Sequence, residues 1–156
     1  HVNHKNPLAF WKFVNVIFEL AFSLQVLIPL FYWLILFPGL TEEHHGIKLQ
    51  KTICVHFVSG LLVWIEICIN KVNFYIRHVF ILLGFLLFYA VLNFIVTQAE
   101  GYPIYSVVTW KDFGTYLYLT LAALVATLGF CLGLFLTRKK NKKADLTSSI
   151  LSESFY

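Results

Sequence analysis

Three ionisable side chains, Glu19, His56 and Glu66, fall inside long apolar stretches of the 156-residue sequence, and the amides of Gln25 and Asn93 lie in similar stretches. An ionisable group at membrane depth is energetically costly, and it usually lines a site or pairs with another polar group. An imidazole in a dry site can serve as a general base, because its pKa lies near neutrality and responds to its surroundings. His56 is therefore the candidate catalytic base, and the two glutamates are candidates for structural pairing.

The spacing of His56 and Glu66 argues against a direct partnership between them. Ten residues separate the two within ICVHFVSGLLVWIEICINK, residues 53–71. In an α-helix this separation is a rise of roughly 15 Å and a net turn of roughly 280°, so the side chains lie about 80° apart around the axis. Both can face the interior of a helix bundle, but they cannot hydrogen-bond to each other. We predict two polar levels, one in each leaflet.

The outer level is the candidate site. Counting inward from the ends of the apolar stretches places His56 in the outer leaflet, with Ser59 one turn away. The same counting places Asn93 and Thr120 at this level on the two following segments. We predict that Ser59, Asn93 and Thr120 line a pocket around His56, with Asn93 as a candidate donor to an oxyanion.

The inner level holds Glu66 and, on the first apolar segment, Glu19, with Lys71 and Arg77 nearby. We predict that these charges form ion pairs that hold the helices together. A proton or ion pathway through Glu19, Glu66 and His56 is a further reading. The gap of roughly 15 Å between the levels argues against such a pathway unless Gln25 bridges it.

Four segments must position these residues. A membrane-spanning helix needs about 20 predominantly apolar residues. The segments that meet this requirement are 13–37, 52–69, 78–97 and 114–137. We expect an all-α fold, a polytopic bundle of four transmembrane helices within residues 1–137. A tilt or kink is expected in the first span, because it contains Pro29.

Composition supports an integral membrane protein. The chain is 59% hydrophobic, 18% aromatic and 13% charged, with a mean hydropathy of +0.75. Nucleic acid is not an expected partner, because the net charge of +4 comes from a tail that flanks the membrane. No metal or other cofactor is expected, since the three cysteines lie in apolar segments and the His44–His45 pair lies in a loop without a second ligand cluster.

The distribution of cations predicts the topology. With four spans, nine of the twelve lysines and arginines lie on the side that holds both termini. By the positive-inside rule, both termini of the chain face the cytoplasm, or the matrix if the membrane is mitochondrial. The tail, residues 138–156, begins with the basic cluster RKKNKK and continues as a Ser-rich segment, which we expect to be disordered.

Several short motifs occur in a characteristic order. They are FYWLILFPGL at 31–40, His56 with Glu66 ten residues on, YIRH at 75–78 and IYSVVTW at 104–110. In this order and spacing, roughly residues 10–113 resemble the androgen-induced, rolling stone-like family of multi-spanning membrane proteins. Some members of that family are similar to intramembrane threonine hydrolases, which cleave fatty-acid esters of hydroxy fatty acids with a threonine nucleophile and a histidine.

The resemblance implies that His56 is the histidine of such a pair and would act as the general base on lipid esters. It places the threonine in an earlier span, so the nucleophile is not located in this chain. The sequence begins at His1 and contains no Met, which favours a processed or partial chain with spans missing at its N-terminal end.

The alternative is a non-catalytic structural or accessory subunit of a larger membrane complex. The 16 phenylalanines of the chain would then pack against partner helices or lipid, and the buried polar residues would serve as contacts between helices. Membrane lipids are expected partners under either reading, and other membrane protein subunits under the second.

Overall fold

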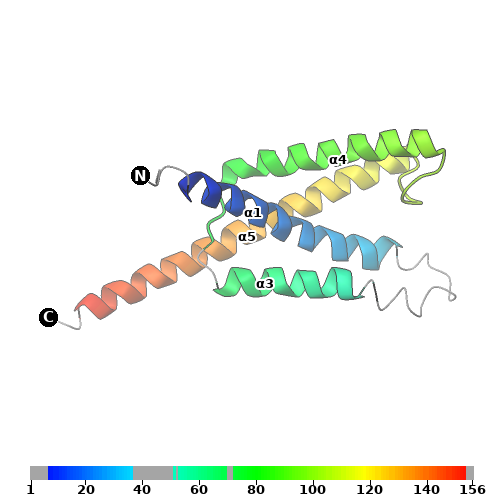
Figure 1. Ribbon diagram of the computed structural model, residues 1–156. Helices are drawn as coiled ribbons and strands as arrows, with labels where there is room; N and C mark the ends of the chain where they lie inside the picture. The colour runs from blue at the N-terminus through cyan, green and yellow to red at the C-terminus, as the bar shows by residue number, and fades with distance from the viewer. Residues whose placement is uncertain (1–6, 37–50, 52, 70–71, 154–156) are drawn as a thin grey trace.

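The computed structural model describes residues 7–36, 51, 53–69 and 72–153, and helices are the only regular secondary structure in these ranges (Figure 1). The α-helices are α1 (Pro7–Phe31), α3 (Ser59–Ile69), α4 (Val79–Glu100) and α5 (Phe113–Glu153). Shorter helical turns are the π-helical segments η1 (Tyr32–Leu36) and η4 (Ile53–Val58) and the 3₁₀ turn η5 (Ile76–His78). The predicted all-α class is confirmed.

Three segments are long and apolar enough to cross a membrane: Phe10–Leu34, Ile76–Glu100 and Phe113–Lys143. They overlap the first, third and fourth predicted spans. Helix α3 is apolar but has only 11 residues. Its rise of about 16 Å compares with roughly 30 Å of hydrocarbon in a bilayer. The second predicted span is therefore helical from Ile53 onward, through η4 and α3, but it is shorter than the other three.

The first span changes its helical geometry after a proline. Pro29 lies inside α1, and the π-helical turn η1 follows directly. A proline inside a helix lacks the N–H that would bond to the carbonyl four residues earlier, and its ring crowds that carbonyl. Widening to π-helical geometry is one way in which a helix accommodates a local break of this kind. The irregularity expected from Pro29 takes this form.

Helix α5 extends well past the predicted end of the fourth span. It continues through the basic cluster and on to Glu153, within the Ser-rich segment where we had expected disorder. No Gly or Pro occurs between Gly133 and Glu153, and the lysines and leucines of this stretch are good helix formers. Local propensity therefore carries the helix beyond the apolar segment.

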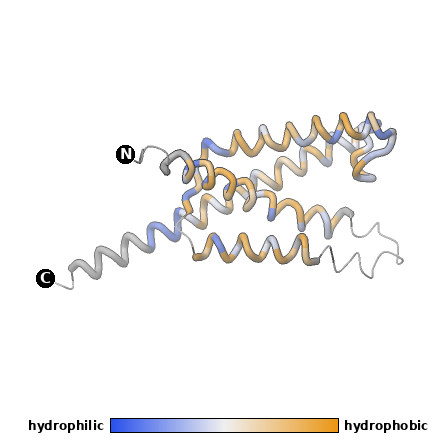
Figure 2. The backbone as a smooth tube through the Cα atoms, in the orientation of Figure 1, coloured by the Kyte–Doolittle hydropathy of each residue, from blue (hydrophilic) through white to orange (hydrophobic). Residues whose placement is uncertain are grey.

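The long helices α1 and α5 cross at the centre of the bundle (Figure 1). Helix α3 packs on α1, and α4 packs on the N-terminal part of α5. The start of α1 and the segment 72–78 lie at one end of the bundle, here called the inner end, and the loop 101–112 lies at the opposite, outer end (Figure 1). Most residues of the helices are apolar, and polar residues gather at the outer loop and at residues 138–143 of α5 (Figure 2).

Aromatic rings fill the centre of the bundle. Phe74, from the connection between α3 and η5, is buried between α1 and α5. Its ring makes edge-to-face contacts with Phe18, Phe22 and Phe130, at centroid distances of 6.4, 5.6 and 5.3 Å. Such pairs contribute about 0.5–1.5 kcal/mol each beyond the area they bury. One residue of a connecting segment therefore completes the core between the two crossing helices.

Two glycines of α5, four residues apart, allow this close approach. A Cβ at Gly129 would lie 3.0 Å from Cβ of Val26 and 3.2 Å from the carbonyl oxygen of Ser23, both on α1. A Cβ at Gly133 would lie 2.5 Å from two ring carbons of Phe74. Small residues spaced in this way let membrane helices pack at short distance where the hydrophobic effect does not drive their association. The α1–α5 crossing therefore depends on Gly129 and Gly133.

We expect Gly133→Ala to destabilise the protein by about 1–3 kcal/mol, because the new methyl group overlaps the ring of Phe74 and the core must shift. Unfolding of the purified protein in detergent micelles measures the change. The matched control is Gly84→Ala on α4, where a Cβ would have nothing within 4 Å. That variant should be neutral or slightly stabilised by helix propensity, and an equal loss in both variants would contradict the packing account.

Candidate functional site

Glu19 is the centre of a polar cluster at the inner end, and it is 0% exposed. Its Oε1 accepts hydrogen bonds from Asn15 Nδ2 at 2.7 Å and from the backbone N–H of Tyr75 at 3.2 Å. Its Oε2 lies 2.7 Å from Nδ1 of His78. Helix α1 places Asn15 and Glu19 on one face, one turn apart, and the segment 72–78 supplies the other two partners. Both carboxylate oxygens are thus satisfied.

The same cluster reaches α5 and the end of α3. Asn15 Nδ2 also donates to the carbonyl oxygen of Asn73 at 2.8 Å, and Asn141 Nδ2 donates to Oδ1 of Asn73 at 2.5 Å. Lys140 Nζ donates to two carbonyl groups in the last turn of α3, at 3.2 and 2.7 Å. A cation is favoured there, because the last carbonyls of a helix lack partners and carry partial negative charge. The inner end is therefore held together by polar contacts between α1, α3, α5 and the segment 72–78.

The structure gives Glu19 a partner that we did not predict. We expected ion pairs among Glu19, Glu66, Lys71 and Arg77, and the structure places His78 beside Glu19. Arg77 is exposed, with its guanidinium 5.8 Å from the ring centre of Tyr75, and Lys71 lies outside the described residues. Successive residues of a 3₁₀ turn point about 120° apart, so His78 faces α1 while Arg77 faces away from it.

Glu66 was expected to face the bundle interior, and it is exposed on the surface of α3. Only one face of this short helix packs on α1, and it buries Gly60 and Ile67. Glu66 precedes Ile67 and is rotated about 100° away from it. Glu19 therefore lies at the bundle interior and Glu66 does not, and structural pairing of Glu66 stays a prediction.

A second polar cluster lies at the outer end, around Trp110. Asn93 is 3% exposed, and its Oδ1 accepts a hydrogen bond from the indole Nε1 of Trp110 at 2.8 Å. The backbone N–H of Trp110 donates to Oγ1 of the buried Thr115 at 2.9 Å. The side chain of Asn93, which we predicted as a donor to an oxyanion, is thus held through its carbonyl oxygen by a residue of the outer loop.

Trp110 has a left-handed backbone conformation, with φ of 61°. This region is uncommon for residues with a bulky side chain and costs on the order of 1–3 kcal/mol. The two hydrogen bonds hold it there, together with edge-to-face contacts to Phe94 and Tyr116 at 5.2 and 6.5 Å. The loop 101–112 is therefore anchored to both α4 and α5 through one residue.

Asp112 caps the N-terminus of α5. Its Oδ1 accepts the backbone N–H of Thr115 at 3.1 Å, and its Oδ2 accepts the hydroxyl of Thr109 at 2.5 Å. An N-cap aspartate satisfies an otherwise free donor and lies at the positive end of the helix dipole. The Thr109 hydroxyl, followed by the backbone donor of Thr115, lowers the pKa of the Asp112 carboxyl.

The residues of the predicted outer pocket have separate partners. The backbone of His56 belongs to η4, but its side chain lies outside the described part of the structure. Ser59 Oγ accepts from Gln25 Nε2 of α1 at 3.0 Å, and the exposed Thr120 donates to the carbonyl of Tyr116 at 2.8 Å. Among the described side chains, no hydrogen bond joins any two of Ser59, Asn93 and Thr120. A pocket around His56 stays a prediction.

The side-chain carbonyl oxygen of Gln25 is a hydrogen-bond acceptor at the same depth in the bundle as His56. This oxygen, Oε1, is buried and has no hydrogen-bond partner among the described residues, while Nε2 of the same side chain is held by Ser59. Ser59 in turn donates to the carbonyl of Val55, within the π-helical turn that contains His56. Leaving a buried acceptor unpaired costs about 1–3 kcal/mol. A donor from outside these contacts would therefore bind favourably next to Ser59.

Two residues that organise these clusters were not found by sequence reasoning. His78 begins the third predicted span, so its depth matched that of Glu19, but we grouped the inner charges by lysine and arginine alone. Trp110 was noted as the last residue of the motif IYSVVTW. Its pairing with Asn93 depends on a left-handed turn, which has no signal in a sequence without Gly or Asn at that position.

In comparisons with protein families, characterised proteins and solved structures, nothing matched this chain.

The Glu19–His78 pair should be strongly coupled. We expect Glu19→Ala to lower the free energy of unfolding by about 3–5 kcal/mol, because its partners Asn15, Tyr75 and His78 would lose their hydrogen-bond acceptor. A double-mutant cycle with His78→Ala, followed by unfolding in micelles, should give an interaction energy of about 1–3 kcal/mol. Glu100→Ala, at the exposed end of α4, is the control and should have little effect. Additive single effects would show that the two residues act independently.

The Asp112 cap should make stability depend on pH. Because folding lowers the pKa of this carboxyl, its contribution is complete above the ordinary value of 3.8 and is lost as the pH falls through the lower folded value. Melting temperatures in micelles between pH 6 and about pH 3 measure the loss. Asp112→Asn keeps a capping side chain that does not titrate, so the acid-induced loss should be smaller than in wild type. Equal losses in both proteins would assign the pH dependence to other groups.

Proposed function

We propose that this chain forms a four-span membrane unit, in which η4 and α3 with their adjoining residues form the second span. Three other segments are long and apolar enough to cross a membrane. A fourth crossing between the first and the third puts the start of α1 and the end of α5 on one side. The excess of lysine and arginine there supports a cytoplasmic or matrix location for both termini.

We further propose that the unit acts as an intramembrane lipid-ester hydrolase of the rolling stone-like kind, with His56 as the general base. The observation that carries this proposal is the buried Oε1 of Gln25, which has no hydrogen-bond partner among the described residues and lies beside Ser59, one helical turn from His56. A free acceptor at this depth suits a substrate hydroxyl or a catalytic hydroxyl group. The π-helical turn Ile53–Val58 adds support, because such turns occur frequently at functional sites.

The chemistry is that of a threonine hydrolase. A threonine hydroxyl, supplied by a span that precedes those of this chain, attacks the ester carbonyl carbon while His56 takes its proton. Collapse of the intermediate breaks the bond to the alcohol oxygen, and the alcohol leaves with that proton. Water then attacks the acyl-threonine, giving one proton to His56, which returns it to the threonine oxygen as the fatty acid leaves. An acyl chain would reach this site sideways from the lipid.

The second candidate function is that of an accessory subunit of a larger membrane complex. It is favoured by the exposed apolar surface of α3 and α4, including Phe80, Leu87, Phe88 and Ile69, each at least 60% exposed. This surface suits lipid or partner helices equally. A polar side chain on a partner helix would then occupy the Gln25 acceptor.

We expect a fluorophosphonate probe to label the full-length protein in membranes, and His56→Ala to abolish this labelling because the nucleophile loses its base. His44→Ala, the same substitution in the predicted loop between the first two spans, is the matched control and should label normally. Unchanged labelling of His56→Ala would reject His56 as the base. Stoichiometric copurification with other membrane proteins, without turnover of lipid esters, would favour the accessory role.

A further inference from the structure

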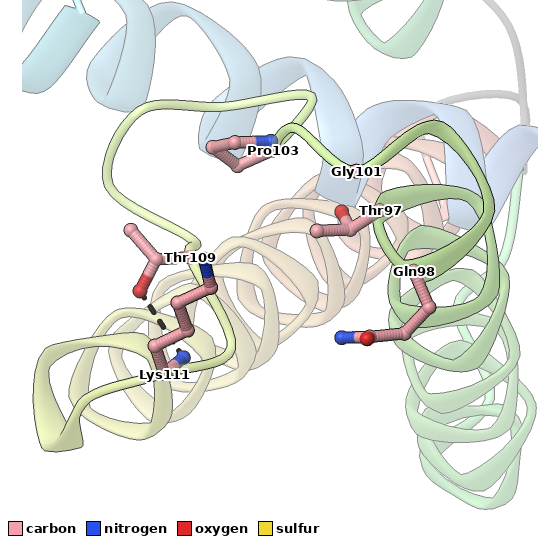
Figure 3. Close-up of a pocket in the computed structure, with 6 residues that line it drawn as sticks. All are labelled: Thr97, Gln98, Gly101, Pro103, Thr109 and Lys111. Carbon is pink, nitrogen blue, oxygen red and sulfur yellow. Dashed lines mark hydrogen bonds between the residues drawn. The ribbon is translucent and has the colours of Figure 1, made fainter.

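A cavity lies at the outer end of the bundle, between the last turn of α4 and the outer loop (Figure 3). Its volume is about 230 Å³, and it is lined by Thr97, Gln98, Gly101, Pro103, Thr109 and Lys111. The side chains of Thr97 and Gln98 point from the helix toward Thr109 and Lys111 of the loop (Figure 3). Sites for whole drug-sized ligands have roughly 300–1,000 Å³. This cavity therefore suits a compact polar group.

The Thr97 hydroxyl is the distinctive feature of the cavity. Thr97 is 5% exposed, and its Oγ1 has no hydrogen-bond partner among the described residues. Other helical hydroxyls of this chain donate to the carbonyl four residues earlier, as Thr120, Thr127 and Thr137 do at 2.7–2.9 Å. Thr97 does not use this option, although its helix offers it. Because threonine populates two χ1 rotamers in a helix, a rotation about χ1 can turn this buried hydroxyl toward a group in the cavity.

The opposite wall supplies a positive charge. Within the described contacts, neither the Lys111 ammonium nor the Gln98 amide has a hydrogen bond or an ion pair. The nearest carboxylate, Asp112, is already held by Thr109 and Thr115. A hydroxyl, an amide and an ammonium that converge without partners match the oxygen atoms of a phosphate group.

The position of the cavity favours a lipid as the source of that phosphate. It lies where the apolar segments of α4 and α5 end, which is the level of head groups in a bilayer. The two residues beside Pro103, Tyr102 and Ile104, are 63% and 47% exposed. An exposed tyrosine and an exposed aliphatic residue at this level are typical of contact with the membrane interface.

We propose that this cavity binds the phosphate of a phospholipid head group in the outer leaflet, through Lys111, Gln98 and the hydroxyl of Thr97. The site is separate from His56 and does not depend on a catalytic role for that residue. It gives the outer loop a lipid ligand that joins α4 to α5.

Native mass spectrometry of the chain in a neutral detergent, titrated with phosphatidylglycerol, tests the proposal. One lipid should bind per chain, and Lys111→Gln and Thr97→Val should each weaken binding about tenfold, as expected for a bond to a charged group. The matched control is Thr120→Val, whose hydroxyl is exposed and bonded within α5. Absence of binding, or equal weakening in the control, would overturn the proposal.

Two further measurements separate the alternatives. Glycerol 3-phosphate and inorganic phosphate, which lack acyl chains, should bind far more weakly than phosphatidylglycerol, and equal affinity would overturn the lipid as the source. In lipid-free protein, Thr97→Val should leave the melting temperature unchanged or raised, because it removes an unpaired hydroxyl. A lowered melting temperature would assign the hydroxyl to the fold and overturn its role in binding.

Discussion

A carboxylate buried among apolar helices must have all its acceptor sites occupied, and this requirement governs the inner half of the structure. Glu19 can lie at 0% exposure only because the segment 72–78 folds back on α1 and presents His78 and the backbone of Tyr75. That return also carries Phe74 into the gap between α1 and α5. The buried carboxyl group, the aromatic core and the path of the connection therefore belong to one arrangement of contacts.

The outer half is organised differently, because hydrogen bonds of Trp110 and Asp112 take the place of the Glu19–His78 contact. Trp110 joins Asn93 of α4 to Thr115 of α5, and Asp112 caps the helix that follows. These contacts determine where the loop 101–112 leaves and enters the two helices, and hence the shape of the cavity next to Thr97. Helix α3 packs on one face of α1 and is held at its end by Lys140 of α5.

Features that depend on local composition could be predicted from the sequence, and features that depend on tertiary contacts could not. The apolar stretches gave the all-α class and three long helices at nearly the predicted places, because span length and hydropathy are properties of consecutive residues. Counting residues from the ends of the spans placed Glu19 among polar residues at the inner end. It could not choose His78 over Arg77 as the partner, since that choice depends on the direction of a 3₁₀ turn.

The contact between Gly133 and Phe74 likewise requires knowing which residue of the connecting segment enters the core. Of the site residues, Ser59 and Asn93 are engaged by Gln25 and Trp110, and neither pairing has a pattern in the sequence.

The continuity of α5 links the outer loop mechanically to the C-terminal end of the chain. Its 41 residues form one helix that begins at the outer loop and ends beyond the bundle (Figure 1), a length of about 62 Å. A flexible tail would let the C-terminal serines explore a wide volume near the membrane surface. A continuous helix gives the backbone of residues 144–153 one direction, so a small rotation of α5 about its crossing with α1 would move this end farther than the rest of the helix. Any protein that bound this end would respond to the tilt of a helix that begins at the outer loop.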